Sequence, residues 1–298
     1  MDYGNSLRHR QRVQLAHILA SVCEARGTDA TGIAYNTADG IKIHKRAVAG
    51  HKLRIRLPNS VTTVMGHTRM TTQGSELQNQ NNHPFAGNTP TGGFALAHNG
   101  VLHNDLLLRE QQYLPDTNIE TDSYIAVQLI EKEEALHLKS LQTMAEQVEG
   151  SFVFTVLDEA DSLYFVRGEN PMMIYHFPKR GLYVYASAKD LLDKALLRFG
   201  YLGEHPVEVK QQCGDILKLT VDGDIHRATF DDSHLFTLSY YPRLTHYYFP
   251  RPMEQSYLEE LKSVAMAFGY TPEEIDELYL QGITPEEIEE YLYCGVEI

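Results

Sequence analysis

The segment Phe94-Ala95-Leu96-Ala97-His98-Asn99-Gly100 decides how we interpret this chain. Its first four residues are apolar, as in a buried strand, and polar residues follow where that strand is predicted to end. The block Gly66-His67-Thr68-Arg69 stands in the same way behind the β-branched, apolar run Val61–Met65. Polar groups at strand ends are a common way for a rigid sheet to present chemistry. An Asn-Gly pair is also a frequent hairpin turn, and that alternative stays open.

These two blocks contain side chains suited to binding an amino acid and an oxyanion. Arg69 offers a fixed fork of donors that matches a carboxylate. Asn99 offers a side-chain N–H group, and Gly100 adds an unhindered backbone N–H next to it. Two such donors aimed at one point are the parts of an oxyanion hole. The sequence therefore predicts a site for acyl chemistry.

Composition restricts the class of protein. The 298 residues are 43% hydrophobic and 22% charged, which is typical of a soluble globular chain. The net charge of −14 disfavours nucleic acid or an anionic membrane as a partner. The three cysteines lie far apart and lack metal-site spacing, so no metal or other cofactor is expected. We see no signal peptide and no apolar run of transmembrane length, and we predict a cytoplasmic protein.

The pattern of turns and apolar residues predicts antiparallel sheets covered by helices rather than a doubly wound parallel sheet, because hairpin spacings dominate. A polar loop is expected over residues 71–93. The expected helices cover residues 7–26, 122–134 (with Thr121 as N-cap), 139–148 and 188–199. The expected strands cover residues 31–36, 41–45, 61–65, 94–102, 152–157, 162–167, 172–176, 182–186, 216–221 and 225–229.

The C-terminal part has a different composition. Residues 236–252 are rich in aromatic and basic residues, which predicts a connector packed on the domain rather than a base-stacking surface. Further on, Thr271-Pro272-Glu273-Glu274-Ile275 recurs at residues 284–288, and each copy is a capping box that begins a helix. We expect two short acidic helices that pack on the main domain through Ile275, Leu278, Ile288 and Leu292. Docking to a partner is the alternative.

Several motifs taken together resemble the class II glutamine amidotransferase domain. They are Arg26–Ala34, Gly66–Gly74, Asn82–Phe85, His98–Val101 and Glu120–Ser123, in the order that this family has them. The resemblance covers roughly residues 10–230. It implies a four-layer αββα sandwich of two antiparallel sheets, as in N-terminal nucleophile hydrolases, with a helical C-terminal extension. It also implies a domain over residues 1–230, followed by a connector and acidic helices over residues 231–298.

The resemblance assigns substrate-binding roles. Arg69 would hold the α-carboxylate of glutamine, with Thr72 and Gln73 beside it, although the family often has His where Gln73 stands. Asp122 would receive the α-ammonium group, and a role at the start of a helix is its alternative. His98 matches a substrate-pocket position of the family, as a packed, hydrogen-bonded residue rather than a base.

The resemblance also assigns catalytic roles. Asn99 and Gly100 would stabilise the tetrahedral oxyanion, at about 3 kcal/mol per donor. Arg26 would lie near the nucleophile, or would cap its own helix. The implied reaction is hydrolysis of glutamine to glutamate and ammonia. A synthetase subunit would accept the ammonia. Glutamine is thus the expected substrate.

The sequence departs from the family at its start. The family's nucleophile is a cysteine directly after the initiator Met, whereas this chain begins Met1-Asp2-Tyr3-Gly4. A terminal cysteine uses its own α-amine as base, so an internal cysteine is no substitute. Three explanations stay open. The first is a start about ten residues upstream, which would restore the nucleophile. The second is an inactive amino-acid-binding, regulatory or assembly module. The third is another amide hydrolysis on the same fold.

Overall fold

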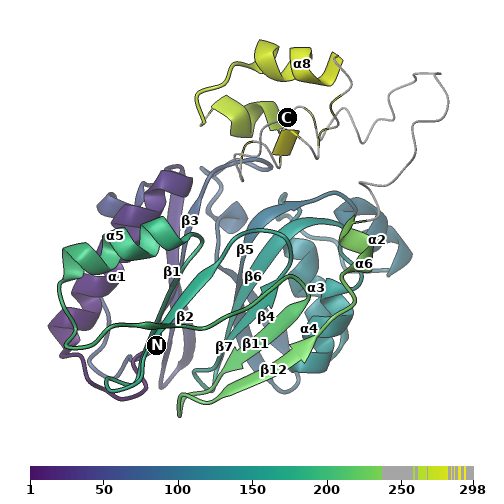
Figure 1. The fold of residues 1–298 in the computed structure, drawn as a ribbon. Helices are drawn as coiled ribbons and strands as arrows, with labels where there is room; N and C mark the ends of the chain where they lie inside the picture. Colours follow the sequence, from purple (N-terminus) through teal and green to yellow (C-terminus); the bar gives the residue numbers. More distant parts are fainter. Residues whose placement is uncertain are drawn as a thin grey trace.

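The computed structural model describes residues 1–236, 258, 261–266, 268–280, 283, 285, 288, 289 and 292. In this part of the chain, helices and antiparallel sheets form four layers in the order helix, sheet, sheet, helix (Figure 1). The predicted α+β class and αββα order are confirmed. Within the described residues, no helix has the length and apolarity needed to cross a bilayer.

One inner layer is a six-stranded antiparallel sheet in the order β12-β11-β7-β6-β5-β4. Along β5, Phe94 and Leu96 pack toward helices, whereas Ala95 and Ala97 pack toward the other sheet layer. This follows from the two-residue period of a strand, which sends successive side chains to opposite faces. The strands are β4 (Phe85–Thr89), β5 (Gly92–Leu102), β6 (Gly150–Asp158), β7 (Leu163–Arg167), β11 (Asp215–Leu219) and β12 (Ile225–Thr229).

Helices cover the outer face of this sheet. Helices α3 (Tyr124–Lys132) and α4 (Leu138–Ala145) contribute Ile125, Ile130 and Leu141, which are fully buried against β5 and β6. The short helix α2 (Asp105–Gln111), which the sequence did not predict, adds Leu108 to the same cluster.

The other inner layer consists of two three-stranded sheets, where we predicted one continuous sheet. Their orders are β2-β1-β3 and β10-β8-β9. Helices α1 (His9–Cys23) and α5 (Lys189–Phe199) lie side by side over this layer (Figure 1). The strands are β1 (Ala30–Thr37), β2 (Gly40–Arg46), β3 (Met65–Arg69), β8 (Met173–Phe177), β9 (Leu182–Ala186) and β10 (Val207–Glu208). Short 3₁₀ turns occur at η1 (Glu24–Arg26), η2 (Gly50–Lys52) and η3 (Asn79–Asn81).

Three local predictions were wrong. The block containing Arg69 lies inside β3 rather than after a strand over residues 61–65, because Met65–Arg69 pairs with β1 throughout. Asn99 and Gly100 lie inside β5, within the strand expected over residues 94–102. The Asn-Gly pair is therefore not a hairpin turn. The expected loop over residues 71–93 contains β4, which pairs with β5. Helix α3 begins two residues later than expected, with Ser123 rather than Thr121 at its N-cap.

The C-terminal extension packs beside the end of β5. Its buried side chains Leu258, Leu261, Ile275, Ile288 and Leu292 form one cluster with Val101 of β5. Helix α8 (Pro272–Leu280) begins at the predicted capping box, since the Glu274 N–H donates to the Thr271 hydroxyl and the Thr271 N–H donates to the Glu274 carboxylate. Helix α6 (Ser233–Phe236) precedes residues 237–257, and the predicted aromatic connector lies there, outside the described residues.

Candidate active site

A small cavity of about 50 Å³ opens where β3, β5 and the start of α3 meet. The residues that the sequence singled out come from segments up to 96 positions apart (26 to 122), yet every one of them lines this cavity. They are Arg26, Arg69, Thr72, Gln73, His98, Asn99, Gly100 and Asp122. The structure therefore brings an arginine, an acid and two amide donors together in a single hollow.

Arg69 is held firmly at one wall of the cavity. Arg69 is only 4% exposed to solvent. The Arg69 guanidinium donates to Asn82 Oδ1 at 2.9 Å, to the Gly74 carbonyl at 3.0 Å and to the Gln73 carbonyl. A charge fixed by three acceptors loses little freedom when it binds a carboxylate. These acceptors take three of the five guanidinium N–H groups, so within the described part of the chain two N–H groups and the positive charge remain for a ligand such as a carboxylate.

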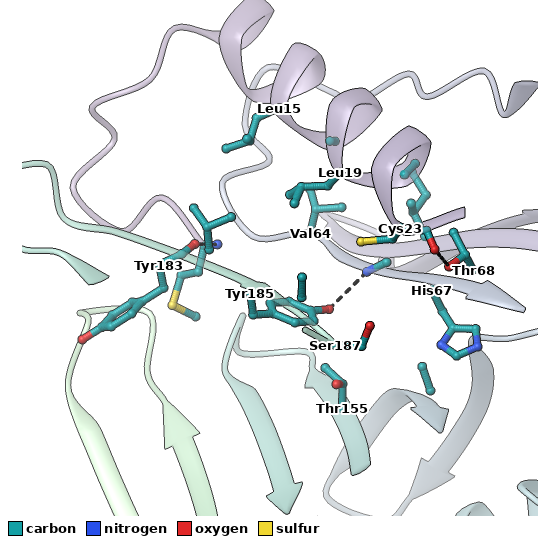
Figure 2. Close-up of a pocket in the computed structure, with 18 of the residues that line it drawn as sticks. Leu15, Leu19, Cys23, Val64, His67, Thr68, Thr155, Tyr183, Tyr185 and Ser187 are labelled. Atoms are coloured by element: carbon teal, nitrogen blue, oxygen red, sulfur yellow. Dashed lines mark hydrogen bonds between the residues drawn. The ribbon is translucent and has the colours of Figure 1, made fainter. Parts of the chain in front are cut away.

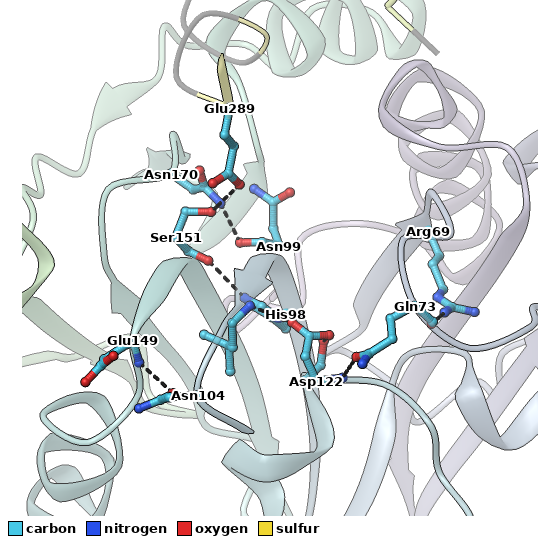
Figure 3. Close-up of polar contacts among 12 residues, drawn as sticks. Arg69, Gln73, His98, Asn99, Asn104, Asp122, Glu149, Ser151, Asn170 and Glu289 are labelled. Carbon is cyan, nitrogen blue, oxygen red and sulfur yellow. Dashed lines mark hydrogen bonds and ion pairs between the residues drawn. The ribbon is translucent and has the colours of Figure 1, made fainter. Parts of the chain in front are cut away.

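Gln73 connects the arginine wall to the acid wall. Its backbone carbonyl accepts from Arg69, and its side-chain oxygen accepts from the Asp122 N–H (Figure 3). Asp122 in turn accepts from the Leu102 N–H at 2.7 Å and from the Ser123 hydroxyl at 3.1 Å. The Asp122 carboxylate thus both ties the start of α3 to β5 and lines the cavity. Burial raises the pKa of Asp122, despite these hydrogen bonds. A cation bound beside it would lower that pKa again.

Asn99 and Gly100 also line the cavity and carry its amide donors. The Asn99 side-chain nitrogen is buried and has no hydrogen-bond partner among the described residues. An unpaired buried donor costs free energy unless a ligand satisfies it. Gly100 has φ +139°, a conformation that favours glycine, and it lies too close to Ser151 and Asn170 for a side chain. The backbone here is therefore shaped by contacts that exclude any Cβ.

The histidines of the site are neutral near pH 7. Burial lowers the pKa of His98 to about 4, and burial followed by the charges of His98 and Arg69 lowers the pKa of His67 to about 3. His98 is hydrogen-bonded to the Ser123 hydroxyl at 2.8 Å and stacks on Phe154. It is a packed strand residue, as we expected, and its position at the cavity wall comes from that packing.

Sequence reasoning missed other residues of the site. His83, Thr121 and Ser123 also line the cavity, and Asn82 orients Arg69. These residues lie in two of the motifs that carry the family resemblance, Asn82–Phe85 and Glu120–Ser123, but no role in the site was assigned to them. Ser151 and Asn170 connect Glu289 to Asn99 through hydrogen bonds, and nothing in the local sequence of Asn170 or Glu289 marks them.

A larger cavity of about 170 Å³ adjoins the small one (Figure 2). The two share Arg26, His67, Thr68 and Asn99 in their walls. The larger cavity lies under α1, between β3 and β9, which are edge strands of the two three-stranded sheets. Across it, the Gly66 N–H of β3 donates to the Tyr185 hydroxyl of β9 at 3.3 Å. The Tyr185 side chain therefore bridges the gap between the two sheets. In a continuous sheet, the backbone of another strand would make these hydrogen bonds.

The first two residues occupy one end of this gap. The Tyr183 N–H of β9 donates to the Met1 carbonyl at 2.8 Å, and the Met1 amine donates to the Tyr183 carbonyl at 2.9 Å. On the other side, the Asp2 N–H donates to the Thr62 carbonyl at 2.9 Å. Met1 and Asp2 thus pair as a strand does, and burial lowers the pKa of the Met1 amine to about 6.

Comparison with known proteins identifies a family for the segment that carries much of this cavity. Residues 67–194, which include the end of β3, all of β5 and the start of α3, match the family described as a glutamine amidotransferase domain. Residues 67–194 thus belong to a glutamine amidotransferase domain. Glutamine–fructose-6-phosphate aminotransferases match the amidotransferase domain over about half of this chain. That of Streptococcus agalactiae is 34% identical over 161 residues, and that of Listeria innocua is 31% identical over 159 residues. Each match covers 51% of this chain but 26% of the relative.

Solved structures share the fold of the amidotransferase domain. Glutamine phosphoribosylpyrophosphate amidotransferase from B. subtilis superimposes with a TM-score of 0.60 at 20% identity, over 73% of this chain and 46% of that one. A second structure, the allosteric regulatory enzyme of purine biosynthesis, gives a TM-score of 0.58 at 19% identity. The chain thus spans about half the length of these structures or less.

Proposed function

We propose that this domain binds glutamine in the small cavity and, with a nucleophile supplied ahead of Met1, hydrolyses it to glutamate and ammonia. The Asn99 side-chain nitrogen is the observation that carries the proposal, because it is a buried donor without a partner among the described residues and it belongs to a cavity that Arg69 and Asp122 also line. Arg69 would take the α-carboxylate of glutamine, helped by Thr72 and Gln73, and Asp122 would take the α-ammonium group.

The chemical step needs a thiolate and two oxyanion donors. The sulfur of a terminal cysteine attacks the side-chain amide carbon of glutamine, and the negative charge moves to the amide oxygen. Asn99 Nδ2 and the Gly100 N–H would hold that oxyanion. The α-amine of the cysteine takes the thiol proton and passes it to the amide nitrogen, so that the C–N bond breaks and ammonia leaves. Water then hydrolyses the thioester, which releases glutamate and restores the thiol. Arg26, in the wall shared by both cavities, would lie beside the sulfur.

The gap between β3 and β9 supports an additional strand ahead of Met1. Met1 and Asp2 already pair with β9 and Thr62, so a segment that continued their direction would run along the larger cavity. An extended segment covers ~3.3 Å per residue. Such a strand would join the two three-stranded sheets into the single sheet that the sequence predicted. Its beginning would reach the shared wall at Arg26 and Asn99.

The names of the relatives, an aminotransferase and an amidotransferase, suggest that the ammonia is transferred to a second substrate. Glutamine–fructose-6-phosphate aminotransferases and a phosphoribosylpyrophosphate amidotransferase carry this domain within longer chains. We propose that residues 1–230 form the glutamine-hydrolysing unit. The ammonia would pass to an acceptor domain or a separate synthetase subunit. Residues 231–298 would follow this unit as a connector and an acidic helical extension that packs on it at Val101.

The test uses two forms of the chain. Titration calorimetry of the chain from Met1 should show glutamine binding, weakened at least tenfold by Arg69→Ala and unchanged by Arg198→Ala at an exposed position. A form extended upstream through a terminal cysteine should release ammonia from glutamine. In that form, Asn99→Ala should lower kcat by about 10²–10³ with little change in KM. Unchanged binding in Arg69→Ala would refute the pocket assignment.

A second candidate function is binding without hydrolysis, and one observation favours it for the chain from Met1. Asp2 cannot serve as a nucleophile, because its carboxylate accepts hydrogen bonds from the Ser6 and Leu7 N–H groups at 2.9 and 3.1 Å. If the chain binds glutamine and the extended form releases no ammonia, the binding function is the correct one.

A further inference from the structure

The C-terminal extension contacts the back of the candidate oxyanion donors. Glu289 is 5% exposed, and its carboxylate accepts a hydrogen bond from the Ser151 hydroxyl of β6 at 2.7 Å (Figure 3). The two residues are 138 positions apart in sequence. None of the described residues of the extension lines either cavity, so this contact supports the site from behind rather than closing it.

The contact continues through Asn170 to Asn99. The Asn170 side-chain nitrogen donates to the Asn99 carbonyl at 2.9 Å and to the Ser151 hydroxyl oxygen at 3.4 Å. Because Ser151 donates its proton to Glu289, its oxygen presents lone pairs to Asn170. This assigns the orientation of the Asn170 amide, with its nitrogen toward Ser151 and Asn99. A chain of three hydrogen bonds thus runs from the extension to one backbone carbonyl of β5.

That carbonyl belongs to the same peptide unit as the Gly100 N–H. The peptide unit is planar and trans, so its C=O and N–H point in opposite directions. A hydrogen bond that fixes the Asn99 carbonyl therefore also fixes the direction of the Gly100 N–H. The φ of +139° at Gly100 shows that the backbone here takes a conformation open to glycine and rarely to other residues. The hydrogen bond from Asn170 to the Asn99 carbonyl stabilises this conformation of the peptide unit.

We propose that Glu289, Ser151 and Asn170 are positioning residues for the Asn99–Gly100 peptide, and that the extension thereby orients the backbone donor of the oxyanion hole. The inference rests on the proposed function, which assigns that donor its role. Apolar packing acts in the same direction, because Val101, the next residue of β5, is buried against Ile275, Ile288 and Leu292 of the extension.

The internal repeat provides a matched control. Asp276 follows Ile275 in the first copy as Glu289 follows Ile288 in the second. The Asp276 side chain is 48% exposed and pairs with Lys262 at 2.7 Å. The two acids thus share a place in the repeat, but only Glu289 has a described hydrogen bond to the site. Replacing Asp276 changes the extension without touching the proposed hydrogen-bond chain.

The experiment reads the Asn99–Gly100 peptide directly. Asn-Gly occurs once in the sequence, so labelling Asn at its carbonyl carbon and Gly at its nitrogen gives a single amide correlation in NMR spectra. In the chain from Met1, Asn170→Ala and Glu289→Ala should shift this signal and speed its amide exchange, at least tenfold for Asn170→Ala. Glu289→Gln keeps an acceptor for Ser151 and should restore most of the protection. Asp276→Ala should leave the exchange rate within twofold.

The outcomes separate this inference from the proposed function. If Asn170→Ala does not fold, Ser151→Ala and Glu289→Ala decide, since in the proposed hydrogen-bond chain the side chains of Ser151 and Glu289 reach the Asn99 carbonyl only through Asn170. An unchanged signal in these variants, or equal effects of Asp276→Ala and Glu289→Ala, would overturn the positioning role. The measurement needs no glutamine. A chain that fails to bind glutamine but shows the expected shifts would disprove the proposed function alone.

Discussion

Gly100 lies directly against the carbonyl group of Ser151. A Cβ on Gly100 would stand 1.9 Å from the Ser151 oxygen and 2.6 Å from the Asn170 side-chain nitrogen. Both neighbours are fixed, one as backbone of β6 and one by its hydrogen bond to Asn99. The close approach of β5 to β6 at the site is therefore possible only with glycine at this position.

Replacing Gly100 with alanine should destabilise the fold strongly. The unfavourable φ alone costs about 1–3 kcal/mol, and the contact with the Ser151 oxygen adds to it. Gly200→Ala is the matched control, because Gly200 has φ +102° and open space around its Cβ position. Urea unfolding should show a larger loss of unfolding free energy for Gly100→Ala than for Gly200→Ala. Equal losses would mean that the contact with Ser151 relaxes freely.

The buried His98 should make the fold less stable in mild acid. Burial lowers its pKa to about 4 in the fold, against about 6.5 when unfolded. The unfolded chain therefore takes up the proton first, and stability present above pH 6.5 is lost as pH falls toward 4. The full shift corresponds to about 3 kcal/mol.

Urea unfolding between pH 7 and pH 4.5 checks this expectation. His98→Gln should flatten the dependence of unfolding free energy on pH, even if it lowers stability at pH 7. His205→Gln, at an exposed position, should keep the slope of the unmodified protein. If His98→Gln retains the full slope, other groups carry the acid sensitivity.

Asp122 should have the opposite effect on stability. Its pKa is raised in the fold, mainly by burial, so its ionisation opposes folding. The contribution of this group to stability is full below its unfolded pKa of about 3.9 and is lost as pH rises through the raised value. Asp122→Asn retains an acceptor for the Leu102 N–H. The unfolding free energy of Asp122→Asn, relative to that of the unmodified chain, should therefore increase as pH rises from 4 to 7. An exposed-site control, Asp222→Asn, should show no such gain.

Cys23 should be unreactive although it lines the larger cavity. Burial raises the pKa of its thiol to about 11 from the usual 9.0, which lowers the thiolate fraction about 100-fold near neutral pH. Iodoacetamide at pH 8 should therefore label Cys23 far more slowly in the folded chain than in urea, as followed by peptide mass spectrometry. Comparable rates in the two states would reopen Cys23 as a candidate nucleophile.

The sequence by itself determined most of the strands and the residue types of the site. The apolar run Phe94–Ala97 is a local signal, and it predicted the strand correctly. The capping box at Thr271 is equally local and was predicted correctly. The motifs with Arg69 and Asn99 indicated the chemistry, because their donor types match a carboxylate and an oxyanion.

Only the tertiary structure decided where these groups meet and what holds them. The strand expected over residues 61–65 was misplaced, because pairing with β1 makes Met65–Arg69 the strand and carries it beyond the apolar run. The hydrogen bond between Ser151 and Glu289 joins residues 138 positions apart, and no local pattern encodes such a contact. Propensity and periodicity act over a few residues, whereas burial of a carboxylate beside a particular hydroxyl depends on how whole layers pack.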